Sequence, residues 1–272
     1  MTPRIAVSSW ALHRTIGVSY PDSPSAPRPD ISTEYSQHSA SPLPLLELPA
    51  ALAKHGYTEM QLCHFHLPDR SPFYTAELRS ALASAGVSLH AVLIDDGDVT
   101  HPENGERDKA WIASWIKTAE SLGAAHARVI AGRQAPTPET MARSAAAFKS
   151  LAAGTSLRLE TENWHELTST PEAVVEFLDR TEGKVGLCAD LGNWPRPRKY
   201  EDLPRIFSFA ETCHAKLEFL TPTTLDMEDA SACLSMAAAV GFDGAYVLVN
   251  GGPGDSEWDA LAIQRDAIVN HR

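Results

Sequence analysis

Three residues in the second half of the chain have side chains that suit a divalent metal: Glu162, Asp190 and His214. Each lies at or near the end of a short apolar segment that reads as a β-strand. Two carboxylates and one imidazole are suitable ligands for Mn²⁺, Zn²⁺, Co²⁺, Fe²⁺ or, less typically, Mg²⁺. An ion with an open coordination position could polarise a substrate hydroxyl or carbonyl. The pattern favours a metal site, although Asp and His at strand ends also commonly cap loops.

Other polar and aromatic side chains follow the same segments. The candidates for substrate binding are His13, Trp164, His165, Asn193, Trp194 and Lys216. The two tryptophans could stack on the apolar face of a sugar, and plain loop packing explains them equally well. His66, Asp95 and His165 are candidates for a general base, with His66 preferred as a catalytic residue.

Glu160 precedes Glu162 by two positions, so strand alternation points both side chains to the same side. A carboxylate facing inward needs a partner, and we expect Glu160 to pair with Arg158 or Arg128. Lys216 is expected to point inward as well. It either neutralises interior carboxylates or contacts substrate oxygens.

The elements that must position these residues recur along the chain. Apolar segments rich in β-branched residues or leucine occupy residues 4–9, 59–65, 87–94, 127–131, 156–162, 184–190, 212–217 and 244–250. Most are separated by roughly 25 to 36 residues, the period of a βαβ unit. The intervening stretches have helical apolar stripes, two of which end at Gly86 and Gly123. The pattern predicts one α/β domain over residues 1–272, a (β/α)8 TIM barrel. An open doubly wound sheet is the rival, but no G-x-G-x-x-G follows the first segment.

Residues 19–44 interrupt this rhythm with seven serines and six prolines in 26 residues. Such a composition disfavours helix and strand. Because the segment follows the first strand, it is a loop insertion on the C-terminal face, where barrel enzymes have their active sites. It is either an inert surface excursion or a lid or wall of the pocket.

Composition limits the classes of function. The net charge is −12, and no basic stripe is visible, which argues against nucleic acid as a partner and against an abasic-site endonuclease. The sequence contains no run of about 18 apolar residues, so no membrane span is predicted. The N-terminal residues lack the apolar region of a secretory signal. The four cysteines form no C-x-x-C pair, so we expect buried reduced thiols in a cytoplasmic protein.

Five segments together resemble the sugar phosphate isomerase/epimerase-like family, which has the xylose isomerase-like barrel. They read IAVSSWALHR, LRLETENWHELTSTPEAV, VGLCADLGNW, CHAKLEF and GFDGAYVLVN. The likeness covers nearly the whole chain and is less clear over residues 19–44. The matching motif positions are Glu162-Asn163, Asp190 with Asn193, and His214 with Lys216.

The resemblance implies that Glu162, Asp190 and His214 bind a divalent metal and that Glu162 acts as a base. The family's fourth ligand, a glutamate at the end of the eighth strand, corresponds here to Asn250. Asn250 could ligate through its carbonyl oxygen but cannot take up a proton. Epimerisation needs an acid/base group on each face of the substrate, so this replacement disfavours the two-glutamate reaction.

We therefore expect a metal-dependent sugar or polyol isomerase or epimerase that abstracts a proton next to a carbonyl. The alternatives are a metal-dependent lyase, dehydratase or hydrolase on the same barrel, and a non-catalytic carbohydrate-binding relative. The expected partner is a small-molecule carbohydrate. A homo-oligomer is compatible with the sequence, and a membrane partner is not expected.

Overall fold

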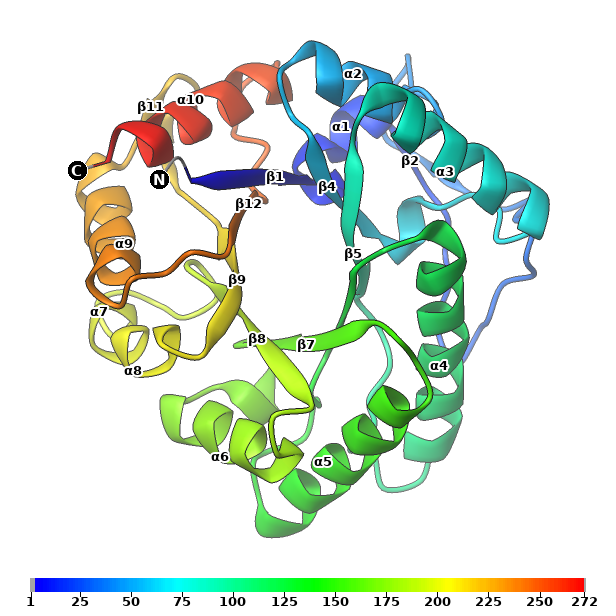
Figure 1. Cartoon of the computed structure of the whole chain (residues 1–272), viewed down its shortest axis with the longest axis vertical. Coiled ribbons are helices and arrows are strands. Elements are labelled where there is room, and N and C mark those ends of the chain that lie inside the picture. Colours follow the sequence, from blue (N-terminus) through cyan, green and yellow to red (C-terminus); the bar gives the residue numbers. More distant parts are fainter. Residues whose placement is uncertain (1–2, 272) are drawn as a thin grey trace.

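A closed parallel barrel forms the centre of the protein (Figure 1). The computed structural model describes residues 3–271. Around the barrel the strand order is β1-β12-β9-β8-β7-β6-β5-β4. These strands are β1 (Arg4–Ser8), β4 (Glu59–Cys63), β5 (Ser88–Ile94), β6 (His126–Val129), β7 (Arg158–Glu162), β8 (Val185–Asp190), β9 (Ala210–Ala215) and β12 (Ala245–Leu248). The predicted TIM barrel is confirmed, and the rival doubly wound sheet is wrong because β1 pairs with β12 and closes the ring.

Helices surround the barrel and connect successive strands (Figure 1). The longer ones are α2 (Leu48–Lys54), α3 (Pro72–Ala85), α4 (Gly105–Leu122), α5 (Pro138–Ala153), α6 (Pro171–Thr181), α9 (Met227–Ala239) and α10 (Glu257–Asn270). Two one-turn helices, α7 (Lys199–Asp202) and α8 (Pro204–Phe207), connect β8 to β9, and α1 (His13–Ile16) follows β1. Short hairpins β2–β3 (Val18–Ser19, Ser36–Gln37) and β10–β11 (Phe219–Thr221, Thr224–Leu225) lie in loops. Within residues 3–271, no helix has both the length and the apolar character that a bilayer span needs.

The main apolar core lies between the outside of the barrel and the helices. Helix α4 contributes Trp111, Ile112, Trp115 and Ile116, all buried. The helix stops at Gly123, whose φ of 77° is left-handed, and α3 stops in the same way at Gly86. Both helices therefore end where the sequence predicts.

The inside of the barrel is largely polar, and one strand irregularity changes which side chains face it. Met60 of β4 pairs with Leu89 of β5, but the next β4 residue, Gln61, pairs with Ala91. His90 is therefore an extra residue in β5, a bulge that turns its side chain toward the interior. Simple alternation along the sequence does not reveal this change.

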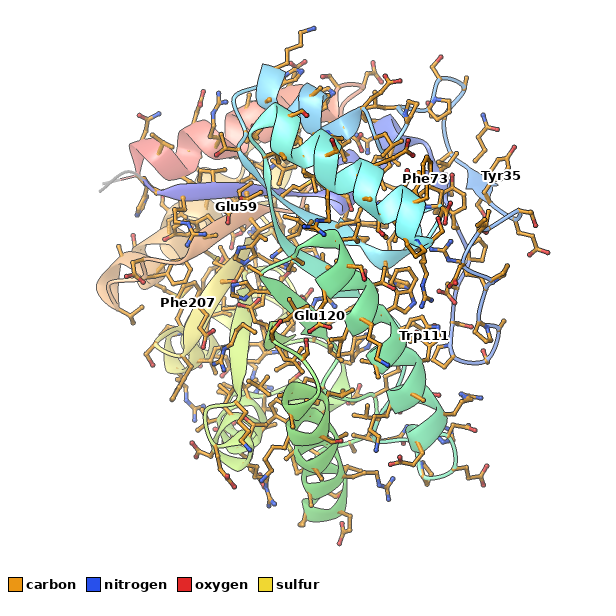
Figure 2. All side chains as sticks on the ribbon, turned by 45° about the vertical axis from the view of Figure 1, so that its right-hand side comes forward. Tyr35, Glu59, Phe73, Trp111, Glu120 and Phe207 are labelled. Carbon is orange, nitrogen blue, oxygen red and sulfur yellow. The ribbon has the colours of Figure 1, made fainter. Side chains whose placement is uncertain are left out.

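The serine- and proline-rich loop at residues 19–44 is held against α4 (Figure 2). Asp22 is the anchor, since its carboxylate accepts hydrogen bonds from the indole nitrogens of Trp111 at 3.1 Å and Trp115 at 2.9 Å. The guanidinium of Arg28 lies 3.5 Å from the same carboxylate, and both side chains are almost fully buried. A buried anchor of this kind docks the loop against α4.

The loop after β5 is fixed by a second buried carboxylate, that of Asp98. It accepts hydrogen bonds from the backbone nitrogens of Thr100 at 2.9 Å and Arg133 at 3.1 Å, and from the amide of Gln134 at 2.9 Å. Burial opposes its ionisation, but the hydrogen bonds from Gln134 and Thr100 outweigh burial and lower the pKa of Asp98.

We expect Asp98→Asn to lower the free energy of unfolding by about 1–3 kcal/mol at pH 7, because it removes a charged acceptor from several donors. The folded pKa lies below the unfolded value of about 3.9. The charge therefore contributes fully above that value, and its contribution is lost as the pH falls through the folded pKa. Urea unfolding at pH 7 and pH 3 checks this: the difference between the two proteins should be smaller at pH 3 than at pH 7. Asp30→Asn, at a side chain that is 71% exposed, is the control and should change little at either pH.

Candidate functional site

A cavity of about 310 Å³ opens at the C-terminal end of the barrel strands. Its lining includes the last residues of several strands, among them Ser8, Cys63, Glu162 and Asp190. This is the end at which TIM barrels place their active sites. Two walls of different character enclose it. The charged wall consists of Asp95, Arg128, Glu162, Asp190, His214 and Lys216, and the apolar wall of Trp10, Cys63, Phe65, Leu93 and Val249.

The charged wall brings together three of the four predicted metal ligands. Nδ1 of His214 lies 3.3 Å from Oε2 of Glu162 and 3.7 Å from Oδ2 of Asp190. All three side chains are at most 5% exposed. Strands β7, β8 and β9 are neighbours, and the register places Asp190 beside His214, which explains the convergence.

A buried guanidinium completes the cluster. Nε of Arg128 lies 3.2 Å from Oε2 of Glu162, and its terminal nitrogen donates to Asp95. Burial alone would lower the pKa of Arg128, but Asp95 and Glu162 raise it above its ordinary value. Arg128 is therefore a permanent positive charge between two carboxylates.

The imidazole of His214 has one nitrogen fixed and one facing the carboxylates. Nε2 lies 2.8 Å from Oε1 of Gln61, an acceptor, so Nε2 has the hydrogen and Nδ1 faces Glu162. Burial disfavours its charged form, but Cys188 and Glu162 raise the pKa of His214 well above 6.5. Burial also raises the pKa of the Cys188 thiol to about 12. Because the Cys188 thiol is uncharged at neutral pH, the Glu162 carboxylate is the negative charge that holds the proton on His214.

Glu162 is oriented from its other oxygen by Asn193. The Asn193 amide nitrogen donates to Oε1 of Glu162 at 2.5 Å, and Nζ of Lys216 donates to the Asn193 carbonyl at 3.1 Å. Burial opposes ionisation of Glu162, but His214 and Arg128 lower its pKa well below the usual range. Glu162 is therefore a fixed, ionised carboxylate.

Half of the residues predicted to bind substrate line this cavity. Trp164, Asn193 and Lys216 do so. His13 does not, and neither does His66, the predicted second catalytic residue. The ring of His66 is buried between Ser9 Oγ and His13 Nδ1, at 2.9 Å from each, and burial lowers its pKa to about 3.

The remaining predicted residues also lie away from the lining. His165, with a φ of 63°, stacks on Trp164 with ring centroids 4.0 Å apart. Trp194 is buried at 6% exposure. The amide nitrogen of Asn250 donates to the Leu217 carbonyl at 2.7 Å, and its oxygen accepts from Gly252 at 2.9 Å. Asn250 therefore stabilises the loop after β12, separated from the three other predicted ligands.

The lining residue at the end of β12 is Val249, which strand alternation explains. Val247 and Val249 pack with Ala6 inside the barrel, so the next residue, Asn250, points elsewhere. Among the lining residues within 3–271, the apolar wall therefore presents no carboxylate opposite Glu162.

Two residues of the site were not predicted from sequence to have a role there. Arg128 was considered only as a partner for Glu160, and Cys188 only as a buried thiol. Yet Cys188 is close enough to Glu162 and His214 to share an ion with them. Cys188 lies two residues before Asp190 on the same strand, so strand alternation would have predicted that both side chains point inward. The predicted partners of Glu160 are wrong: Arg158 pairs with Glu211, and Arg128 with the charged wall.

The ligand atoms of Glu162, Cys188 and His214 lie within 4.8 Å of one another, a spacing that suits a divalent ion, and Asp190 lies beside His214. Oε2 of Glu162 is buried and has no hydrogen-bond partner. Its distance to Nδ1 of His214, 3.3 Å, matches the separation of about 3.0–3.5 Å between two ligand atoms bound to one ion. The residues present therefore fit a metal, although Arg128 next to the same oxygen opposes its binding electrostatically.

The barrel is that of a known protein family. The model of the xylose isomerase-like TIM barrel family matches residues 49–214. The chain belongs to the xylose isomerase-like TIM barrel family. The matched region extends from the start of α2 to His214 and so includes Glu162 and Asp190. No curated protein matches the chain in sequence.

Solved structures agree with this xylose isomerase-like fold over the whole chain. A xylose isomerase-like TIM barrel protein from Mycobacterium smegmatis, in complex with magnesium, is 17% identical, with 98% of each chain covered and a TM-score of 0.63. A sugar phosphate isomerase/epimerase from Parabacteroides distasonis is 12% identical, with 100% of this chain and 96% of that chain covered and a TM-score of 0.64. A probable 3-DHS dehydratase from Bacillus anthracis is 9% identical, with 99% and 100% covered and a TM-score of 0.67.

Proposed function

We propose that this protein is a metal-dependent isomerase of a small sugar or polyol, in which protons move on one face of the substrate. The observation that carries the proposal is the contrast between the two walls of the cavity. All ionisable groups of the charged wall lie on β5 to β9 or directly after those strands, whereas the apolar wall offers no carboxylate. Isomerisation between neighbouring carbons can use one base on one face, but epimerisation with inversion needs a group on each.

Glu162, Asp190 and His214 would hold the ion, with Cys188 beside them. When bound, the ion supplies Lewis-acid polarisation of a substrate carbonyl or hydroxyl. The thiol and imidazole favour a transition metal over Mg²⁺.

Glu162 is the group that would accept the proton. Because Oε2 would bind the ion, Oε1, which now accepts a hydrogen bond from Asn193, would be the oxygen that receives the proton. A carboxylate of low pKa is a weak base, so the substrate C–H must be made acidic by a polarised carbonyl next to it. Glu162 would take the proton from one carbon and return it to the adjacent carbon on the same face, while the hydroxyl proton passes to the former carbonyl oxygen within the bound substrate.

Arg128 and Lys216 would stabilise negative charge that develops on the substrate oxygens. Arg128 is held rigidly by two carboxylates, and Lys216 by Asn193. Charges fixed in advance inside a water-poor cavity stabilise a transition state without reorganising. Trp164, over which Arg128 lies at 5.4 Å from the ring centroid, would pack on the carbon skeleton.

A second candidate, dehydration of an acidic polyol, is favoured by Lys216. Its ammonium lines the cavity and donates one hydrogen bond, which leaves capacity for a substrate carboxylate. The same base on the same face would then remove a proton while a neighbouring hydroxyl leaves.

Solvent-deuterium exchange separates these proposals. Purified protein with Mn²⁺, Co²⁺ or Zn²⁺ is incubated in D₂O with pentoses, hexoses and polyhydroxy acids, and the products are followed by proton NMR. Deuterium at the carbon next to the carbonyl together with an aldose–ketose pair supports the isomerase. Loss of water from an acid supports the dehydratase. Metal binding without exchange or turnover would contradict both.

The metal assignment has its own test. We expect His214→Ala to lose about one divalent ion per chain relative to the parent, because it removes the nitrogen that would bind the ion once the ion displaces its proton. Elemental analysis after dialysis against Co²⁺ measures this. His55→Ala is the matched control, since His55 stacks on Trp258 at the surface of the molecule. Equal metal content in the parent and in His214→Ala would sink the assignment.

A further inference from the structure

A second cluster of ligand-type side chains lies inside the other end of the barrel. His90 of β5, His126 of β6 and Glu160 of β7 each present an atom within 4.8 Å of the others. His126 is the first residue of β6 and Glu160 the middle residue of β7, and both precede the residues of these strands that line the cavity. The group is therefore distinct from the charged wall. Arg128, two residues after His126 on the same strand, belongs to the charged wall.

The strands bring these residues together through the bulge in β5. Ala91 pairs with His126, so the extra residue His90 lies directly before that pair. The two imidazoles stack with centroids 4.4 Å apart and planes at 15°, so one ring must turn out of the stack for both lone pairs to point at one ion. Glu160 follows on the next strand, with Oε1 at 3.2 Å from Nδ1 of His126.

Two atoms in this cluster lack hydrogen-bond partners despite burial. Oε2 of Glu160, a residue with 0% exposure, has no partner, and neither has Nδ1 of His126. The 3.2 Å contact between Glu160 and His126 thus lacks hydrogen-bond geometry. The 3.2 Å distance is close to the separation of about 3.3 Å between two ligand atoms on a tetrahedral zinc ion.

The surroundings of His90 fix the tautomer that a metal ligand requires. Nδ1 of His90 lies 3.1 Å from Oε1 of Glu59, so a hydrogen on Nδ1 leaves the lone pair of Nε2 directed inward. Carboxylates orient metal-binding histidines in this way. Nε2 lies 3.1 Å from the hydroxyl oxygen of Thr212, whose one hydrogen is donated to Glu160 at 2.7 Å, so the ion would replace Thr212 as the partner of Nε2. Glu59, labelled in Figure 2, lies beside the start of β1 through its contact with Arg4.

We propose that His90 Nε2, His126 Nδ1 and Glu160 bind a zinc-type dication at the N-terminal end of the barrel, with the Thr212 hydroxyl or a water beside it. Two imidazoles and a carboxylate form a familiar zinc ligand set. Glu59 and Glu160 supply negative charge, of which Arg4 offsets part, and Arg158 is neutralised by Glu211. His126 is 21% exposed, so an ion can enter from the N-terminal end. The ion would tie β5, β6 and β7 together and would take no part in the reaction at the other end.

The test is direct location of zinc in crystals of the full-length protein. Crystals soaked in Zn²⁺ are measured on both sides of the zinc absorption edge. We expect an anomalous peak between His90, His126 and Glu160 in the parent and in His214→Ala. The same peak should be absent from His126→Gln and retained in the matched control His55→Gln. Zn²⁺ should also raise the melting temperature of the His214→Ala protein by several degrees, and should not do so once His126→Gln is added.

The parent crystals alone keep the proposal falsifiable if His126→Gln fails to fold. An absence of anomalous density between His90, His126 and Glu160 at millimolar Zn²⁺ would overturn the proposal. So would a peak that persists unchanged in both His126→Gln and Glu160→Gln. Neither result bears on turnover or on metal at Glu162, so failure here is distinguishable from failure of the proposed function.

Discussion

An Arg128→Met protein without added metal should unfold with a free energy about 3–5 kcal/mol below that of the parent. The guanidinium is 3% exposed and lies between Asp95 and Glu162. Methionine fills a similar volume, but it leaves both carboxylates in a poorly solvated interior without a fixed positive charge. Urea unfolding followed by circular dichroism measures the difference.

Arg133→Met is the matched control for this prediction. Arg133 pairs with Asp96 at 3.3 Å, but the two side chains are 37% and 38% exposed, so its loss should cost less than about 1 kcal/mol. Added Co²⁺ should recover part of the stability of Arg128→Met, because an ion beside Glu162 replaces the missing charge. If both arginine variants lose the same small amount, the buried ion pair is not the stabilising element assigned here.

Glu162→Gln should reduce kcat for proton transfer about 10²–10⁴-fold, the contribution typical of a positioned acid/base group. Glutamine keeps an acceptor for Asn193 but cannot take up a proton. The deuterium exchange of the substrate in D₂O should fall in parallel with kcat, since both require the same proton transfer.

Glu166→Gln serves as the control for Glu162→Gln, because Glu166 is exposed in the loop after β7 and does not line the cavity. It should retain parental kcat and exchange. A Glu162→Gln protein that still exchanges deuterium at the parental rate would exclude Glu162 as the base and would direct attention to Asp95.

The repeat of apolar segments was enough to predict the barrel, because each strand must bury both faces and each helix one face. It also predicted the convergence of Glu162, Asp190 and His214, since carboxyl ends of parallel strands meet at one edge. The direction of side chains beyond the last paired residue was harder to predict. Asn250 was expected at the site, but Val249 has the inward phase, and the Asn250 amide bonds to its own loop.

Interior partners were the least predictable part of the site. A single extra residue in β5 turns His90 inward. Neither the composition nor the spacing of residues 87–94 predicts this bulge. With His90 and His126 inside, Glu160 faces histidines in place of the expected arginines. Arg128 then lies two residues further along β6, where it faces Asp95 and Glu162. These choices depend on distances across the barrel, which the order of residues along one strand does not specify.

The apolar wall has a stereochemical consequence for the proposed reaction. A substrate between Glu162 and Val249 would have one prochiral face toward a carboxylate and the other toward hydrocarbon. Hydrogen could then leave and return only suprafacially, so each product would have a single configuration. Shielding by Trp10, Phe65 and Val249 would also slow exchange of the abstracted hydrogen with water. A substrate labelled with tritium at the reacting carbon would therefore pass part of its label to the neighbouring carbon of the product.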